Sequence, residues 1–144
     1  MSFFQGKNIL NKFLKRPRIN WSIFELDSSL QLNEFVELLL EPIKKSHSRY
    51  LIKLGLHEAI VNAVKHGNNL DPNKNVRVRR IITPNWCVWQ IQDQGNGLEV
   101  KNRNFNLPQK ASSVCGRGLY IISECFDDIR WSNKGNRLQL ALKR

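Results

Sequence analysis

Apolar residues recur at helical spacing in three segments of the chain and alternate with polar residues in five others. The first pattern predicts helices and the second predicts strands. The helices are expected at about residues 30–45, 49–66 and 118–126. The strands are expected at about residues 21–26, 76–83, 86–93, 128–132 and 137–142. Because the elements come in runs rather than in strict alternation, they predict an α+β fold with helices on one face of a mostly antiparallel sheet.

Helix-breaking residues set the expected ends of the first two helices. Pro42 falls inside the first helical pattern, where it should kink or end the helix. The run Gly67-Asn68-Asn69 should stop the second helix. The residues expected to form the core are Ile52, Leu56, Ala59, Ile60, Ala63, Ile91, Leu119, Ile122 and Phe126.

The chain has the size and composition of one globular domain. It has 144 residues, of which 41% are hydrophobic, and this is enough to bury a core without disulfides. We divide it into a basic N-terminal arm, residues 1–20, and a domain, residues 21–144. If the arm is helical, its apolar residues share one face and it can bind a membrane surface or a partner; the alternative is a tail or strap.

Charge and cysteine content narrow the class of protein further. The formal charge of +11 favours acidic partners, namely nucleotide phosphates, nucleic acid, an acidic protein surface or anionic lipid. Cys87, Cys115 and Cys125 lack CxxC spacing and predict neither a disulfide framework nor a zinc site. No apolar run approaches the roughly 20 residues of a membrane span, and no signal peptide is evident. We therefore expect a cytoplasmic protein.

The second predicted helix carries polar residues along one flank. Glu58, Asn62 and His66 are four residues apart, so at ideal helical geometry they stack beside the buried stripe. The amide oxygen of Asn62 can bind a hard cation such as Mg²⁺. The Glu58 carboxylate can orient or deprotonate a hydroxyl group. Taken alone, this pattern is more typical of a polar helix flank that faces solvent.

Two glycine-containing segments follow. Asp93-Gln94-Gly95-Asn96-Gly97 comes directly after a strand, where an aspartate can accept a hydrogen bond from an exocyclic amine such as that of adenine. Gly116-Arg117-Gly118-Leu119 opens the last helix, whose free N–H groups can bind phosphate. Each segment alone is also typical of an ordinary turn or loop. Neither a Walker A loop nor a Rossmann fingerprint occurs.

Together, in this order, the segments HEAxxNAxxHG, DxGxG and GxGL resemble the N, G1 and G2 boxes of the GHKL ATPase superfamily. Within it, the chain resembles the bacterial anti-sigma factors with serine kinase activity. The resemblance runs from about residue 23 to residue 142. It implies an α/β sandwich with a mixed, mainly antiparallel sheet, and ATP and Mg²⁺ as cofactors.

The resemblance also implies a role for each matching residue. Glu58 would be the catalytic base, Asn62 would hold Mg²⁺, and Asp93 would bind the adenine amine. His66 would have a supporting role. The implied nucleotide-binding residues are Asn62, His66, Asp93, Gly95, Gly97, Gly116, Arg117, Gly118 and Leu119.

The segment between Gly97 and Gly116 would be an ATP lid. Cations in or beside it could assist phosphoryl transfer, and their spacing does not select one of them. They are Lys101, Arg103, Lys110 and Arg117. The sequence departs from the family pattern in its high positive charge, in its arm and in Cys115, which precedes Gly116. None of these departures removes an implied catalytic residue.

Four functions fit these observations to different degrees. The favoured one is an ATP-dependent serine/threonine protein kinase that sequesters a sigma factor, switches partners with an antagonist protein and can form a homodimer. The next is a nucleotide-dependent binding module without catalysis. A nucleic-acid-binding protein is supported by the charge and by Trp86, Trp89 and Trp131, although these tryptophans suit core packing. The catalytic half of a histidine kinase is disfavoured, because we find no helical hairpin with a phospho-accepting histidine.

Overall fold

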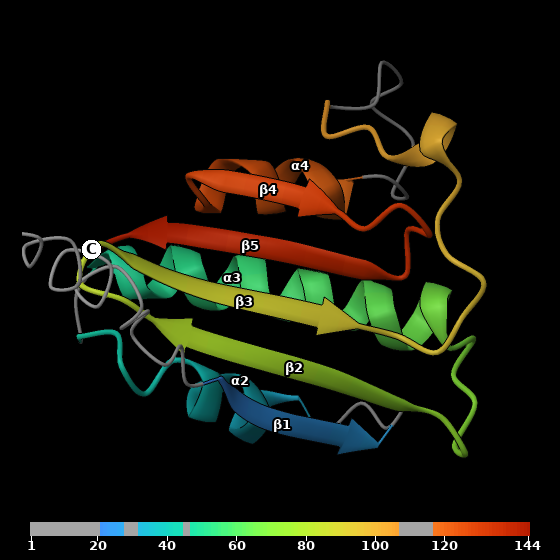
Figure 1. The fold of residues 1–144 in the computed structure, drawn as a ribbon, viewed down its shortest axis with the longest axis horizontal. Coiled ribbons are helices and arrows are strands. Elements are labelled where there is room, and N and C mark those ends of the chain that lie inside the picture. The colour runs from blue at the N-terminus through green and yellow to red at the C-terminus, as the bar shows by residue number, and fades with distance from the viewer. Residues whose placement is uncertain (1–20, 28–31, 45–46, 107–116) are drawn as a thin grey trace, which may run out of the picture.

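The structure, a computed structural model, describes residues 21–27, 32–44, 47–106 and 117–144. Its strands form one sheet in the order β1-β2-β3-β5-β4 (Figure 1). The strands are β1 (Ser22–Asp27), β2 (Asn75–Ile82), β3 (Trp86–Gln92), β4 (Asp128–Trp131) and β5 (Arg137–Lys143). The helices are α2 (Asn33–Leu39), α3 (His47–Asn62), the π-helical turn η1 (Ala63–Gly67), the 3-10 turn η2 (Val100–Asn102) and α4 (Arg117–Cys125). The N-terminal arm, residues 1–20, lies outside the described residues.

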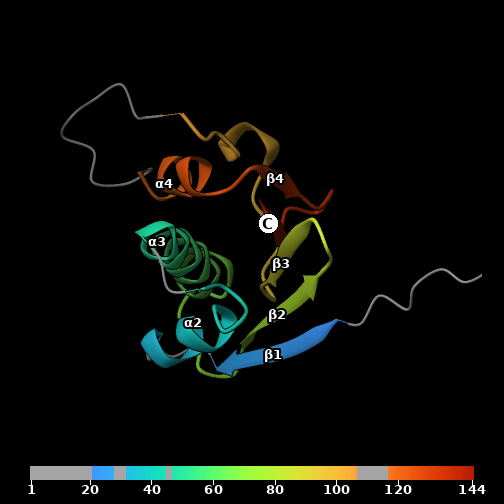
Figure 2. The same cartoon turned by 90° about the vertical axis from the view of Figure 1, so that its left-hand side faces the viewer.

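The sheet is antiparallel in all four of its described strand pairs, rather than mixed. The α-helices α2, α3 and α4 lie on one face of it (Figure 2). Strand residues alternate between the two faces, so one set points toward the helices. In β3 this set is Cys87, Trp89 and Ile91, all buried. The expected α+β fold with helices on one face is therefore confirmed.

The first helix is shorter than its apolar pattern predicts, because α2 ends at Leu39 and not near residue 45. Pro42 lies in the turn that follows it. The carbonyl oxygens at the helix end are paired by the sheet: Arg80 Nη1 donates to Leu38 O at 2.9 Å, and Trp89 Nε1 donates to Leu39 O at 3.1 Å. A buried guanidinium also suits the negative end of a helix dipole. These long-range bonds fix the helix end, and the local sequence does not reveal them.

The second helix keeps its predicted position but changes its winding near the end. α3 continues directly into the π-helical turn η1, which Asn68 closes by donating its backbone N–H to Ala63 O at 2.8 Å. A π turn changes the angular position of every later residue. The even four-residue stacking expected for Glu58, Asn62 and His66 therefore holds only as far as Asn62.

Helix α4 packs closely against α3 at a glycine. A Cβ atom built on Gly55 would lie 2.6 Å from Cε2 of Phe126 and 2.8 Å from Cβ of Cys125. Phe126 also makes an edge contact with the buried Trp89 ring, with centroids 6.0 Å apart. Every residue predicted for the core is buried except Leu119, which is half-buried and packs against the core.

The tryptophans differ in position, contrary to the expectation that all of them suit the core. Trp89 is fully buried. Trp86 lies three residues before it, so it points to the opposite face, where Lys143 Nζ is 5.7 Å from its ring centroid. Trp131 is half-buried at the edge of the core. Within the described ranges, none of the helices has the length and apolar character needed to cross a membrane.

Candidate functional site

A cavity of about 330 Å³ opens between the helix layer and the sheet. Its walls come from segments far apart in the sequence: α3 with η1, the loop after β3, the start of α4 and the β4–β5 hairpin. The described residues that line it are Ala59, Asn62, Ala63, His66, Gly67, Asn69, Ile91, Asp93, Asn96, Gly97, Leu98, Asn102, Gly118, Leu119, Trp131, Gly135 and Leu138. The volume is that of a small-molecule site, with an apolar floor and few polar groups.

The floor of the cavity is a row of apolar residues across three strands. Ile91 of β3 is opposite Leu138 of β5, which in turn is opposite Trp131 of β4. All three line the cavity, and this row offers a flat apolar surface to a planar ligand such as a nucleotide base. Ile91 was predicted for the core and Trp131 lies at a position that was expected to suit core packing, but none of the three was predicted for the site, because cross-strand pairing sets the row.

Two polar side chains from α3 meet the start of α4. A Cβ atom built on Gly118 would lie 3.1 Å from Glu58 Oε2 and 3.4 Å from Asn62 Nδ2. The two residues are one helical turn apart, so both side chains project to the same side. Asn62 lines the cavity, whereas Glu58 lies beside it. The side chains of Glu58 and Asn62 therefore lie beside the start of α4, which carries the GxGL segment.

Asp93 lies at the end of β3 with its carboxyl group held between two glycines. Oδ1 accepts the N–H of Gly95 at 2.8 Å, and a Cβ atom on Gly67 would overlap the carboxyl group. Only glycine allows the end of η1 to approach the carboxyl group so closely. Burial raises the pKa of Asp93 above its ordinary value of 3.8. Asp93 lines the cavity, where it can accept a hydrogen bond from a bound ligand.

The loop after Asp93 is joined to the β4–β5 hairpin. Leu98 N–H donates to Gly135 O at 2.9 Å. The Arg103 guanidinium donates to Leu98 O at 2.8 Å and to Asn133 O at 3.0 Å. Gly97 has a φ of 91°, and a Cβ atom there would overlap Lys134 O. This contact explains the second glycine of the DxGxG segment.

Arg103 therefore has a structural role in joining the loop to the hairpin. Its guanidinium donates to backbone carbonyl groups, and Arg103 is not among the described residues that line the cavity. Gly135 lies between the strands predicted at about residues 128–132 and 137–142 and was not a predicted site residue, yet it lines the cavity. The turn sequence signals the hairpin, but nothing in it signals the approach of the distant loop.

The remaining predicted site residues have mixed outcomes. His66 lines the cavity, but its side chain is exposed. Gly95 is buried behind Asp93 and is not a lining residue. Arg117 is exposed at the first residue of α4 and is not among the described lining residues either. Gly116, Cys115 and Lys110 fall outside the residues that the structure describes.

The residues beside Gly118 fit a magnesium ion only in combination with a phosphate ligand. Among the described residues, no group of three or more His, Cys, Asp or Glu side chains could hold a metal ion by itself. The chain offers the Asn62 amide oxygen and the nearby Glu58 carboxylate. Mg²⁺ commonly takes one or two protein oxygens and completes its shell with phosphate oxygens and water. The donor set is therefore that of a metal–nucleotide site rather than of a protein metal cage.

Comparison with known proteins supports this interpretation of the cavity. The model of the histidine kinase-like ATPase domain family matches residues 34–142 of the chain. The match begins in α2, ends in β5 and includes every residue that lines the cavity. No curated protein matches the chain in sequence.

Proposed function

Because the chain belongs to the histidine kinase-like ATPase domain family, we propose that it is an ATP-binding anti-sigma regulatory factor with serine/threonine protein kinase activity. Domains of this family bind ATP, generally with Mg²⁺. The observation that carries the proposal is the convergence of Glu58 and Asn62 on Gly118 at the start of α4. One group can act as a base and the other as a metal ligand, at a helix start suited to phosphate.

The cavity supports a specific orientation of the nucleotide. The adenine base lies on the row Ile91, Leu138 and Trp131, with its amine directed toward Asp93. The phosphates then extend toward Gly118, where the helix N–H groups and dipole favour negative charge. Asn62 lies beside this end and supplies one oxygen for the magnesium ion that accompanies ATP.

Glu58 is the general base in the proposed reaction. It accepts the proton of a serine or threonine hydroxyl group as that oxygen attacks the γ-phosphorus, while the bond to the β-phosphate oxygen breaks and ADP leaves. The acceptor would belong to an antagonist protein. Phosphorylation of the antagonist would then decide whether the domain holds the antagonist or a sigma factor, by mass action between competing partners.

A label-transfer experiment tests the kinase proposal. The wild-type protein and Glu58→Gln are incubated with γ-labelled ATP, Mg²⁺ and a cell extract from the source organism that has been treated with phosphatase and then heated, so that neither the phosphatase nor the kinases of the extract remain active. Labelled amino acids are then identified. We expect phosphoserine or phosphothreonine with the wild type and none with Glu58→Gln, although both bind ATP by calorimetry. A wild type that binds ATP but labels no protein would instead support a non-catalytic nucleotide-dependent binding module.

A further inference from the structure

Asn68 is the only fully buried polar side chain among the described residues, and it lies directly after the π turn. A buried amide of this kind requires hydrogen-bond partners. Its neighbours are the first residue of β2 and the residues that follow β3. These segments come from separate parts of the chain. Asn68 therefore lies where the end of η1, the start of β2 and the end of β3 meet.

The Asn68 side chain binds two of these segments at once. Its Oδ1 accepts the backbone N–H of Gln94 at 2.7 Å, and its Nδ2 donates to Asn75 O at 3.1 Å. Gln94 Oε1 in turn accepts the backbone N–H of Asn75 at 2.6 Å. The pairing of β2 with β3 ends at Arg77 and Gln92. Beyond that point, side-chain amides replace the backbone ladder in joining the two strands.

This network encloses Asp93 on both sides. Asp93 lies between Gln92, the last residue of β3, and Gln94, whose N–H is bound by Asn68. On the helix side, Gly67 touches the Asp93 carboxyl group and is the residue just before Asn68. One side chain thus fixes both the backbone that carries Asp93 and the glycine against which its carboxyl group rests.

We propose that Asn68 is a positioning residue for base recognition, which holds Asp93 where its carboxylate can accept the 6-amino group of a purine. This inference rests on the proposed function, because it presumes that the cavity holds an adenine nucleotide. Asn68 does not line the cavity and does not touch the ligand. Its effect is transmitted through Gln94 and Gly67, and it bears on the choice of base rather than on phosphate binding.

The test compares ATP with purine riboside triphosphate, which lacks the 6-amino group. Dissociation constants for both are measured by calorimetry with the wild type, with Asn68→Ala and with Asn73→Ala. Asn73 has an exposed side chain in the same connection, so it is a matched control for loss of an amide. A hydrogen bond to a charged group corresponds to roughly ten- to hundredfold in affinity, so the wild type should prefer ATP by that factor.

We expect Asn68→Ala to lose most of this preference while it still binds purine riboside triphosphate, and Asn73→Ala to keep it. An Asn68→Ala protein that retains the wild-type preference, or that binds both nucleotides more weakly by the same factor, would overturn the inference alone. A folded wild type that binds neither nucleotide would overturn the proposed function itself.

If Asn68→Ala does not fold, the wild type still decides the question. The side-chain amide resonances of Asn68 are followed by NMR during titration with each nucleotide. We expect ATP to shift these resonances more than purine riboside triphosphate does, because only ATP has a 6-amino group that can donate a hydrogen bond to the Asp93 carboxylate. Equal shifts with the two nucleotides would overturn the inference.

Discussion

Gly55 is a point of close contact between α3 and the end of α4, and Gly55→Ala tests whether this contact sets the helix layer. The added Cβ atom would lie 2.6 Å from the Phe126 ring and 2.8 Å from Cβ of Cys125. Neither atom is the free end of a flexible side chain, so the helices must move apart. Overpacking of this kind costs about 1–3 kcal/mol, and the better helix propensity of alanine returns about 1 kcal/mol.

Because the added atom would meet two neighbours at less than 3 Å, we take the upper part of the overpacking range, about 2–3 kcal/mol. After the gain in helix propensity, we expect Gly55→Ala to lower the free energy of unfolding by about 1–2 kcal/mol. For a domain of this size, that loss corresponds to a fall in melting temperature of roughly 2–8 °C. Urea denaturation followed by circular dichroism measures the free energy. Phe126→Leu should remove the ring edge that the new methyl group would meet. The loss of stability in the double variant should therefore be smaller than the sum of the losses in the two single variants.

The result that would refute this reasoning is a Gly55→Ala protein as stable as the wild type or more stable, with no coupling to Phe126→Leu. In that case the close approach of the helices would not be a feature of the folded chain. The placement of Gly118 beside Glu58 and Asn62, which depends on the same packing, would then lose its support.

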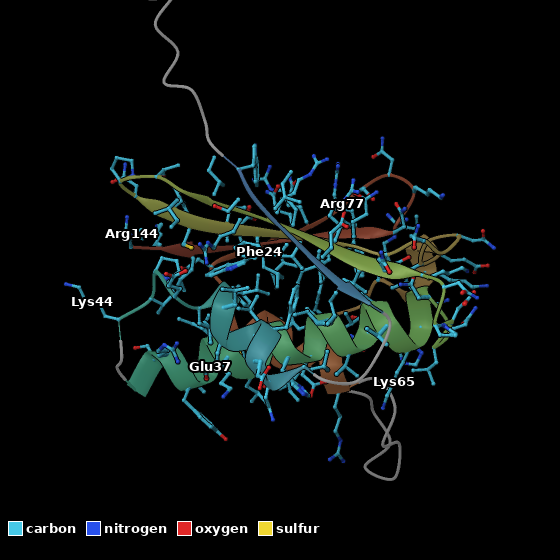
Figure 3. All side chains as sticks on the ribbon, turned by 90° about the horizontal axis from the view of Figure 1, so that it is seen from below. Phe24, Glu37, Lys44, Lys65, Arg77 and Arg144 are labelled. Atoms are coloured by element: carbon cyan, nitrogen blue, oxygen red, sulfur yellow. The ribbon has the colours of Figure 1, made fainter. Side chains whose placement is uncertain are left out.

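Two further predictions concern pH. Because burial raises the pKa of Asp93 above 3.8, its carboxyl group gains a proton as the pH falls through that raised value, so the preference for ATP over purine riboside triphosphate should decline there. Calorimetry across this pH range measures the ratio of the two dissociation constants, in which the titration of the phosphate groups cancels. A ratio that does not change with pH would contradict the role of Asp93. Glu37 of α2 lies in the helix layer (Figure 3), where hydrogen bonds from Arg49 and then Lys53 lower its pKa from 4.5 to about 2. The ion pairs of Glu37 should stabilise the fold fully above pH 4.5, and this stabilisation should be lost as the pH falls toward 2. Glu37→Gln should therefore make the midpoint of urea denaturation less dependent on pH in this range. The effect should be small because the Glu37 carboxylate is exposed to solvent.

Sequence patterns were sufficient for most of the fold because each element carries a local period. The strands and α4 follow from alternation and helical spacing, and the glycine boxes mark both ends of the site. Pro42 indicated that the first helix ends or kinks near it, but the end at Leu39 itself was not predicted, because Arg80 and Trp89, some 40 residues or more away, bind the carbonyl groups there. The π turn at residues 63–67 also lacks a sequence signal, so the position of His66 was predicted from ideal geometry.

The cavity itself required the tertiary structure. Trp131 and Gly135 belong to the last hairpin, and only the pairing of β5 with β3 brings them to Asp93. Asn68 appeared in the sequence as part of a helix stop, with no indication that its side chain is buried between two strand ends. Local sequence patterns therefore identified Glu58, Asn62 and Asp93, which lie in or beside the cavity, whereas the other walls and supports of the site come from long-range contacts.

The measurement that tests the central claim most directly is calorimetric titration of the protein with ATP and ADP, with and without Mg²⁺, beside Asp93→Asn. The substitution keeps the volume of the side chain but replaces one acceptor oxygen with a donor and removes the charge. We predict magnesium-dependent binding by the wild type that is lost or much weakened in a folded Asp93→Asn protein. Equal binding by the two proteins would contradict the adenine assignment, and no binding by a folded wild type would contradict the account of the cavity as an ATP site.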